Sequence, residues 1–319
     1  MTVALQTGAA AFSPQTTCWV CTGSRLLRFH QCRLDFREYT RQDPELAEYS
    51  GRNVWIVRCR NCGFGQPEEL PRLPRFFERM YDQRWSDEWV DREFEAKYKD
   101  LIFQTILRHL DRRLRPGAPR RLLDVGAHAG RFMSVSQLAG WEVEGLEVNP
   151  KTAACAERRT GAIVHRVSID AIAGEGRRYT AVTLTDVLEH IPDPVHVLTA
   201  AARLLAPGGV VAVKVPSGPA QLRKEQVLSA LNRSRPISLA GNLVHVNHFS
   251  PQSLRLALER AGFDEITIAP AAPELRYDGK WIRRAASNAL RLTMYAGAHV
   301  AGVRSPAALN LQAYARWTA

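Results

Sequence analysis

The chain has 319 residues, of which 45% are hydrophobic and 24% are charged, and its formal net charge is +11. One domain of ordinary size does not need this length, so we expect a main domain with smaller attachments. No uncharged apolar run approaches the roughly 18 residues that span a bilayer, and the first residues lack the basic-then-apolar order of a secretory signal. These observations exclude a membrane-spanning protein and predict a soluble cytoplasmic one.

The positive charge is carried almost entirely by arginine, because only six of the 43 basic residues are lysine. A net positive charge can indicate a nucleic-acid partner. However, such an arginine bias is typical of a GC-rich genome, and basic and acidic residues are mixed along the chain as on a solvated surface. The composition therefore disfavours nucleic acid as a partner.

The first 75 residues divide into two predicted parts. Residues 1–17 are small and polar without periodicity, which predicts a flexible tail. Residues 18–75 contain the cysteine motifs described next, with an excursion between Asp35 and Asn53, and end in a proline-rich linker, "QPEELPRLPRF". We expect a small zinc-binding module followed by a stiff connection.

Four of the six cysteines form two CxxC pairs, "CWVC" and "RCRNC", which contain Cys18, Cys21, Cys59 and Cys62. Two residues between thiolates let one tight turn direct both sulfurs to one point, and two such turns complete a tetrahedral zinc shell without an open position. Two disulfides or a redox dithiol are alternatives, but a cytosolic setting and the absence of a neighbouring βαβ pattern disfavour them. We predict structural zinc, with Cys32 or His30 as a less favoured replacement ligand.

The main domain is expected over residues 76–270. Helical spacing between Phe76 and Leu114 precedes an alternation of buried strands and helices. The predicted strands are "RRLLDV", "WEVEGLEV", "AIVHRV", "YTAVTLTDV", "GGVVAVKV" and "DEITIA", and the predicted helices cover 130–140, 150–161, 194–205 and 251–261. This order predicts an α/β fold with a doubly wound, mostly parallel sheet that is covered by helices on both faces.

Residues 271–319 are predicted to form a C-terminal helical extension. The segment "WIRRAASNALRLTMYAGAHVAG" is basic and partly amphipathic. We expect it to pack back on the main domain, with a membrane surface or a second subunit as alternatives. A homodimer is thus one possible assembly.

The turn "LLDVGAHAG" after the first strand of the main domain is glycine-rich. Such a turn brings backbone N–H groups and a helix N-terminus close to a ligand. Its D-x-G-x-x-x-G spacing does not match the dinucleotide motif GxGxxG, and the sequence contains no triphosphate motif GxxxxGK[ST]. Glu147 ends the second strand 21 residues after Gly126, where a carboxylate can accept both ribose hydroxyls. Together these features predict a nucleoside ligand.

The order of segments from about residue 76 to 270 resembles the class I S-adenosylmethionine-dependent methyltransferases. The matching pieces are "LLDVGAHAGRF", "VEGLEVNP", "TLTDVLEHIPDP", "LLAPGGVVAVKVPS" and "HVNHFSPQSLRLALERAGF". The resemblance implies a Rossmann-like, seven-stranded sheet and S-adenosylmethionine as cofactor. It also implies ten cofactor-binding residues, from the methionine end through ribose and adenine to the amino group: Asp124, Gly126, Ala127, Gly130, Glu147, Val148, Val167, Ser168, Thr185 and Asp186.

One residue departs from the family pattern. The middle glycine of the turn is replaced by His128. We expect its side chain to point outward, with contact to a substrate as the alternative.

Candidate catalytic residues lie in "TDVLEH" and "HVNHF". His190 has an ordinary pKa near 6.5, suited to accepting a hydroxyl proton, with Glu189 and His245 beside it as further candidates. The LEH segment can equally be a helix-start element in which Glu189 accepts backbone N–H bonds. Alternatively, the segment DxxEH with a downstream histidine resembles the ExxEH metal site of ubiquinone-pathway and small-RNA O-methyltransferases, which implies a divalent ion, with Asp186 replacing the first glutamate.

The acceptor is the least determined part of the prediction. A zinc knuckle before this domain resembles methyltransferases of bacterial sugar, polysaccharide and secondary-metabolite pathways. That resemblance implies O- or C-methylation of a small molecule: a sugar, a nucleotide-linked sugar or a natural product. The alternatives are an RNA methyltransferase whose zinc module captures nucleic acid and a binding module without turnover.

Overall fold

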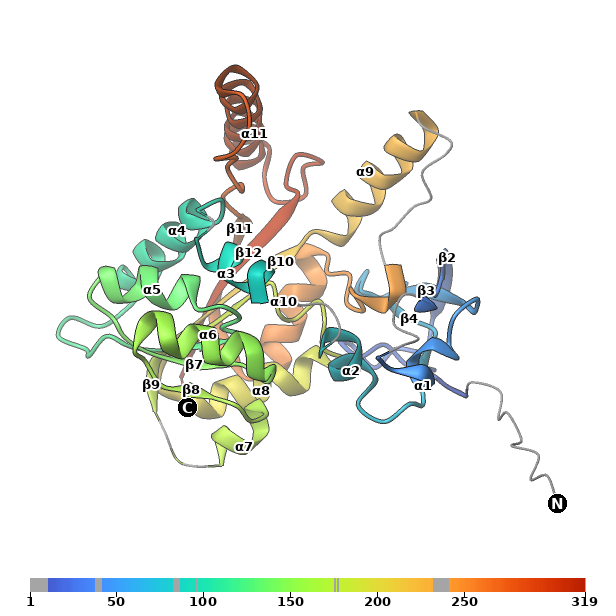
Figure 1. Ribbon diagram of the computed structural model, residues 1–319, viewed down its shortest axis with the longest axis horizontal. Helices are drawn as coiled ribbons and strands as arrows, with labels where there is room; N and C mark the ends of the chain where they lie inside the picture. The colour runs from blue at the N-terminus through green and yellow to red at the C-terminus, as the bar shows by residue number, and fades with distance from the viewer. Residues whose placement is uncertain are drawn as a thin grey trace.

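The computed structural model describes residues 11–37, 42–82, 87–95, 97–174, 176, 178–231 and 241–318. Its centre is a seven-stranded sheet in the order β11-β12-β10-β9-β6-β7-β8 (Figure 1). The strands are β6 (Arg121–Val125), β7 (Glu142–Leu146), β8 (Val164–His165), β9 (Tyr179–Thr185), β10 (Leu205–Pro216), β11 (Phe263–Pro270) and β12 (Asn310–Trp317). The predicted doubly wound α/β fold is confirmed.

The pairing between strands explains the sequence pattern. Strands β8, β7, β6, β9 and β10 are parallel to one another. Residues of β6 and β10 are buried on both faces of the sheet, which accounts for the continuous apolar runs. Strand β12 is antiparallel to both neighbours, β10 and β11.

Helices cover both faces of the sheet. One hydrophobic cluster packs α4 (Asp100–Asp111), α5 (Arg131–Leu138) and α6 (Pro150–Thr160) on the sheet, and a second packs α7 (Ile169–Ala173), α8 (Pro194–Leu204) and α10 (Pro251–Arg260). Side chains cap two of these helices: Asn149 caps α6, and Ser250 forms a capping box with Ser253 at the start of α10. Two further helices, α2 (Phe76–Asp82) and α3 (Asp87–Glu95), precede α4.

The C-terminal segment corrects the sequence analysis. The predicted helix exists as α11 (Trp281–Ala301), but the last strand, β12, lies inside the central sheet between β10 and β11. The prediction of a helical extension is therefore wrong for residues 310–317. The segment "NLQAYARW" contains two alanines and no β-branched residue, so only Tyr314 and Trp317 favour a strand and the signal is weak. Burial between two neighbouring strands decides its conformation.

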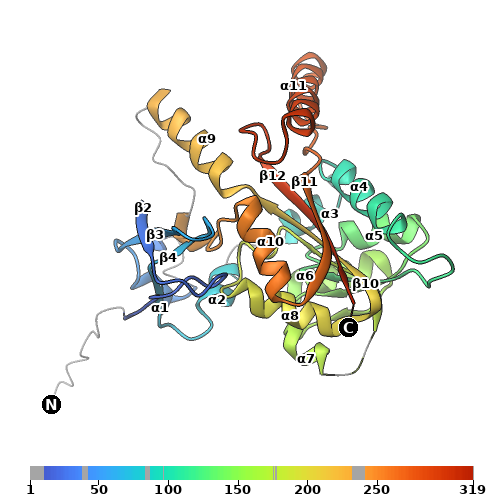
Figure 2. The same ribbon diagram turned by 180° about the vertical axis from the view of Figure 1, so that it is seen from behind.

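Helix α11 also differs from the prediction that it packs back on the domain. Only Ala298 of α11 is buried, and the helix stands away from the sheet in both views (Figures 1 and 2). Within the described residues, none of the helices combines the length and the apolar character that crossing a bilayer requires.

The cysteine-rich part contains a three-stranded antiparallel sheet of β2 (Leu26–Arg33), β3 (Asn53–Cys59) and β4 (Gly65–Pro67), with the short helix α1 (Pro44–Ala47) in the predicted excursion. The predicted tail is wrong for its described end, because β1 (Phe12–Pro14) pairs with β5 (Glu69–Pro71), which lies in the expected linker. The Phe12 ring packs edge-to-face on Tyr49, 5.4 Å between centroids, and this contact fixes the strand. Residues 1–10 lie outside the described residues.

This module and the main domain share one hydrophobic core. Gly65 and His248 exchange two backbone hydrogen bonds of 2.9 and 3.0 Å, and the rings of Phe64 and Phe249 lie 5.2 Å apart. The Arg260 guanidinium also donates to the Val20 carbonyl oxygen at 2.7 Å. The segment before α10, which follows η2 (Gly241–Leu243), is thus held between the module and the sheet.

Candidate active site

A cavity of about 900 Å³ lies at the carboxyl edge of β6, β7 and β9, where doubly wound sheets bind ligands. Eight of the ten predicted cofactor residues line it: Asp124, Gly126, Ala127, Glu147, Val148, Ser168, Thr185 and Asp186. The other two, Gly130 and Val167, are not among the lining residues.

Gly130 has a structural reason for being glycine. It begins α5 with φ of +86°, and a Cβ there would lie 2.9 Å from the Cα of Ala156 in α6. The residue therefore allows α5 and α6 to approach closely rather than contacting a ligand. Val167 is 40% exposed, beside the cavity-lining Ser168 that caps α7.

The glycine-rich turn is held by the neighbouring strand. The N–H groups of Gly126 and Ala127 both donate to the Leu146 carbonyl oxygen, at 2.8 and 3.1 Å. Gly126 has φ of +73°, and a Cβ there would lie 2.5 Å from a methyl carbon of Val187. These two N–H groups thus join the turn to β7.

Two buried carboxylates face the cavity from adjacent strands. Glu147 accepts hydrogen bonds from the N–H groups of His128 at 2.9 Å and Asn149 at 2.8 Å, so its carboxylate is fixed in place. Asp124 accepts from the Thr183 hydroxyl at 2.8 Å. Burial raises the pKa of Asp124 to about 7, and the charge of Glu147 acts in the same direction. A cationic ligand beside Asp124 would favour its ionised form.

Asp186 lies between two lysines that sequence analysis did not select. Its carboxylate accepts from the Lys99 ammonium at 2.9 Å and from Lys214 on its other oxygen. Burial by itself raises the pKa of Asp186, but the charges of Lys214 and Lys99 outweigh it and hold the pKa below its usual range. Lys214 is the lone charge within the apolar run "GGVVAVKV" and one of only six lysines, a signal that could have identified it.

The geometry of His190 determines its tautomer. Its Nδ1 lies 2.6 Å from the Val244 carbonyl oxygen, which can only accept, so Nδ1 carries the proton in the neutral ring and Nε2 is then the basic nitrogen. The Tyr81 hydroxyl contacts the same Nδ1 and the same carbonyl oxygen. His190 lines the cavity, whereas Glu189 and His245 are not among its lining residues.

Glu189, His190 and His245 nevertheless form a cluster whose ligand atoms lie within 4.8 Å of one another. Burial raises the pKa of Glu189 to about 8, with Asp186 adding to the shift, and burial lowers the pKa of His245 to about 3. The donor set of one carboxylate and two imidazoles suits a divalent metal. Asp186, expected as the first ligand, is not in this cluster because its oxygens are bound by lysines.

His128 does not point outward, so that expectation is wrong. Its ring lines the cavity and packs edge-to-face on Trp89, with 5.2 Å between centroids. Its φ of +51° is in the left-handed region, where the family's glycine fits without strain. Burial and the charge of Lys99 lower the pKa of His128 to about 4, so the imidazole is neutral at physiological pH.

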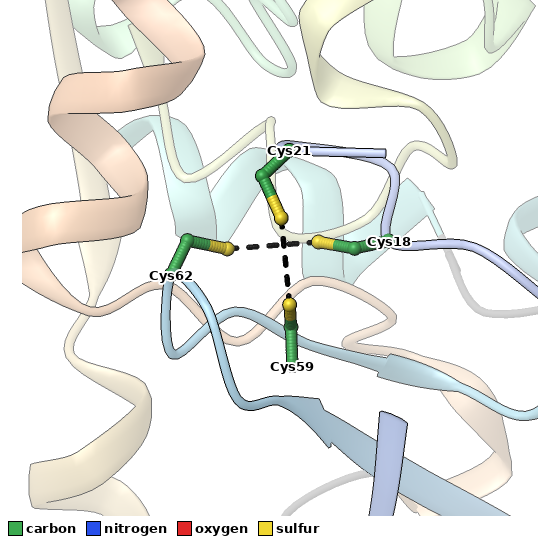
Figure 3. A group of neighbouring side chains, drawn as sticks. All are labelled: Cys18, Cys21, Cys59 and Cys62. Carbon is green, nitrogen blue, oxygen red and sulfur yellow. Dashed lines mark hydrogen bonds between the residues drawn. The ribbon is translucent and has the colours of Figure 1, made fainter. Parts of the chain in front are cut away.

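The four paired cysteines converge on one point, as predicted (Figure 3). The sulfurs of Cys18 and Cys62 lie 3.6 Å apart and those of Cys21 and Cys59 lie 3.4 Å apart. Tetrahedral zinc with Zn–S bonds of about 2.3 Å separates its sulfurs by about 3.8 Å, so the donor set fits this ion. Cys32 lies in β2 in a different hydrophobic cluster and is not part of this group.

Comparison with known proteins identifies the main domain. A family model described as "Methyltransferase domain" matches residues 94–268, which is more than half of the chain. The chain belongs to this methyltransferase family. The matched region contains β6 to β10 and most of the residues that line the cavity, whereas Phe76, Tyr81 and Trp89 precede it.

Curated relatives cover the same region. The chain is 36% identical over 130 residues to a ubiquinone biosynthesis O-methyltransferase of Paracidovorax citrulli, a match that covers 39% of this chain and 54% of the relative. It is 35% identical over 120 residues to the enzyme with the same name from Cereibacter sphaeroides, with 35% of this chain and 49% of the relative covered. The chain thus spans about half the length of the curated relatives that it matches.

One solved structure supports the fold. The methyltransferase chain in a complex with the Trm112 methyltransferase activator of Haloferax volcanii aligns with a TM-score of 0.50 and 16% identity. The alignment covers 73% of this chain and 97% of that chain. Class I methyltransferase architecture is therefore shared at the level of the fold.

Proposed function

We propose that this protein transfers the methyl group of S-adenosylmethionine to a hydroxyl oxygen of a small-molecule acceptor. The observation that carries the proposal is His190, which lines the methyltransferase cavity and whose Nδ1 is held by the Val244 carbonyl oxygen. Bound S-adenosylmethionine supplies an electrophilic methyl group on a sulfonium, so the protein must orient the acceptor and remove its proton.

The cofactor is proposed to lie along the carboxylates of the cavity. Glu147, fixed by two backbone N–H groups, presents its oxygens to the ribose hydroxyls. Asp124 provides a negative charge for the cationic methionine end. Val148, 54% exposed and lining the cavity, offers an apolar surface for the adenine, next to Ser168 at the start of α7.

His190 is proposed to accept the proton of the acceptor hydroxyl at Nε2. The hydrogen bond from Nδ1 to the Val244 carbonyl oxygen holds the ring in the required tautomer. The Tyr81 hydroxyl contacts the same Nδ1 and helps to fix the ring. Glu189 lies 4.0 Å from Nε2, where its carboxyl group influences the proton affinity of the ring. Tyr81 and Glu189 are therefore positioning residues.

The acceptor is proposed to be a natural product or sugar derivative with an apolar or aromatic body. The curated relatives are named O-methyltransferases of ubiquinone biosynthesis, which favours oxygen over carbon as the methylated atom. Six aromatic side chains line the cavity: Phe76, Phe77, Tyr81, Trp89, Tyr98 and Phe103. Such a lining binds ring-containing ligands through stacking and edge contacts better than it binds a ligand that is recognised mainly by its phosphate groups.

The four cysteines are proposed to hold one structural zinc ion. Three of them are buried in the same hydrophobic cluster as residues of β9, β10 and α10, so the ion would stabilise the contact between the module and the main domain. Its coordination shell is complete with four thiolates, which assigns it no catalytic step.

The experiment uses purified full-length protein and a panel of phenolic, glycosidic and RNA acceptors, with S-adenosylhomocysteine release as the readout. His190→Ala is expected to lower kcat by about 10²- to 10⁴-fold and to leave the Kd of S-adenosylmethionine unchanged. His196→Ala is the matched control, because it removes another cavity-lining imidazole whose Nε2 is already paired with Asp170 at 2.9 Å. Equal kcat in the two variants would contradict the proposal.

Two further readouts separate the alternatives. Methylation of RNA with affinity that falls steeply as salt rises would favour the RNA-capture hypothesis over a small acceptor. Mild chelation that leaves the zinc content unchanged tests for a second metal ion. If activity is lost and returns on adding Mg²⁺, the result would favour a divalent ion at Glu189, His190 and His245 over an imidazole base.

A further inference from the structure

Helix α11 presents its apolar side to solvent. Ile282 is 62% exposed, Leu290 63% and Val300 92%, whereas amphipathic helices of globular proteins normally bury such residues. Both views show the helix projecting from the sheet (Figures 1 and 2). Helix α11 therefore exposes apolar residues that an ordinary surface helix would bury.

The side of α11 that faces the protein makes polar contacts, and further along the helix Tyr295 and Ala298 lie on the same side. Asn288 exchanges two hydrogen bonds of 2.8 and 2.9 Å with the backbone of Arg276, and the Arg291 guanidinium donates to the Glu274 carbonyl oxygen at 2.8 Å. Two turns after Arg291, Ala298 is fully buried. Residues 288, 291 and 298 share one side of the helix, so these contacts fix the rotation of α11 about its axis.

The side opposite these contacts carries a heptad repeat. Six exposed positions recur with spacings of four, three, four, three and four residues, which is the spacing of a coiled-coil seam. They are Ile282, Ala286, Ala289, Thr293, Ala296 and Val300. This seam is about 27 Å long at 1.5 Å per residue.

The seam is symmetric about its midpoint at residue 291. In an antiparallel pair of two copies, Ile282 of one copy would lie opposite Val300 of the other, and Ala286 opposite Ala296. The small residues at the centre let two helices approach closely, and the larger residues fill the space at both ends. Such self-complementarity is what a two-fold interface between identical chains requires.

The residues beside the seam are compatible with the same pairing. Leu290 and Leu292 would each lie near their own counterpart across the two-fold axis, and Arg283 would lie opposite Gly297. Arg291 is used on the attached side, so its charge does not meet the second helix. The pairing therefore brings no like charges into contact.

An anionic lipid surface is the competing occupant. The chain has no acidic residue after Asp278, which suits anionic headgroups. However, the centre of the exposed side consists of alanine and threonine, which would insert little apolar volume into a bilayer, and a lipid surface does not explain the heptad spacing or its symmetry. The observations favour a second copy of this chain.

We propose that the protein forms a two-fold symmetric dimer through antiparallel pairing of α11. Sedimentation velocity of the full chain tests this. The wild type is expected at twice the chain mass of 35.7 kDa, and Ala289→Arg and Ala296→Arg are expected at the mass of one chain. Ala301→Arg is the matched control, because Ala301 is an exposed alanine of the same helix outside the seam, and it should remain dimeric.

Disulfide cross-linking tests the direction of pairing. Because Ile282 is expected opposite Val300, a mixture of the single variants I282C and V300C should give a cross-linked dimer mapped by peptide mass spectrometry, and neither variant should give it alone. Cross-linking of I282C with itself would overturn the antiparallel pairing.

Three results would overturn the proposal. The first is a single-chain mass for the wild type at high protein concentration. The second is a dimer that both seam variants leave intact. The third is a single-chain protein that binds phosphatidylglycerol vesicles through the seam, losing that binding in Ala289→Arg, which would assign the face to a lipid surface.

Discussion

Replacing Lys99 by methionine is expected to destabilise the protein by about 2–3 kcal/mol at neutral pH. The Lys99 ammonium lies 2.9 Å from the Asp186 carboxylate, and both side chains are largely buried. At an effective dielectric constant of about 20, charges at this separation attract by about 6 kcal/mol. Removing an ammonium from water costs several kcal/mol of that attraction. Lys214 remains beside Asp186 in the variant, so we expect a value slightly below the 3–5 kcal/mol typical of breaking a buried pair.

The pH dependence of this effect has a defined sign. The pKa of Asp186 is held below its usual range in the folded protein. The stabilisation from the pair is thus complete above the unfolded pKa of about 3.9 and is lost only as pH falls through the lowered folded value. The difference between wild type and Lys99→Met should therefore be fully present at about pH 5.5 and should not shrink at about pH 8, where Lys99 also favours the ionised form of Glu189, whose pKa is about 8.

Urea unfolding followed by circular dichroism measures the free energy of unfolding of both proteins. Lys97→Met is the matched control, because Lys97 is exposed two residues away and the chemical change is identical. The control should stay within about 0.5 kcal/mol of the wild type. Equal stability of the two variants, or a difference that disappears at pH 8, would refute this account of the Lys99–Asp186 pair.

Three further variants test other parts of the structure. Cys59→Ala should lose the single zinc ion and lower stability, whereas Cys32→Ala should keep one zinc per chain by elemental analysis. Because the pKa of Asp124 is about 7, its carboxylate loses charge as pH falls from 8 to 6. The affinity for S-adenosylmethionine in calorimetric titrations should therefore weaken by up to about tenfold over this range. Asp124→Asn should remove this pH dependence. Gly130→Ala should lower the free energy of unfolding in urea by about 1–3 kcal/mol more than Gly117→Ala does. Both glycines have positive φ, but only the Cβ added at Gly130 meets a backbone carbon of α6. Equal losses in the two variants would contradict this close helix packing.

The sequence by itself determined the parts of this protein that depend on local patterns. Alternating apolar runs and caps define the order of β6 to β10 and their helices, because the hydrophobic period and the end signals of each element lie within that element's own sequence. The spacing from Gly126 to Glu147 and the two CxxC pairs are equally local, and the structure brings the paired cysteines together as predicted. The roles of the individual cofactor and catalytic residues stay predictions that the variants above test.

Only the tertiary structure decided the features that join distant segments. The sequence of β12 has only a weak strand propensity, and its burial between β10 and β11 makes it a strand. Lys99 and Lys214 are 115 positions apart and meet only at Asp186, while the tautomer of His190 depends on the carbonyl of Val244 in another segment. The solvent-facing side of α11 is set by hydrogen bonds to the segment before it. Local propensity carries no information on these choices, because each energy term arises only after the chain has folded.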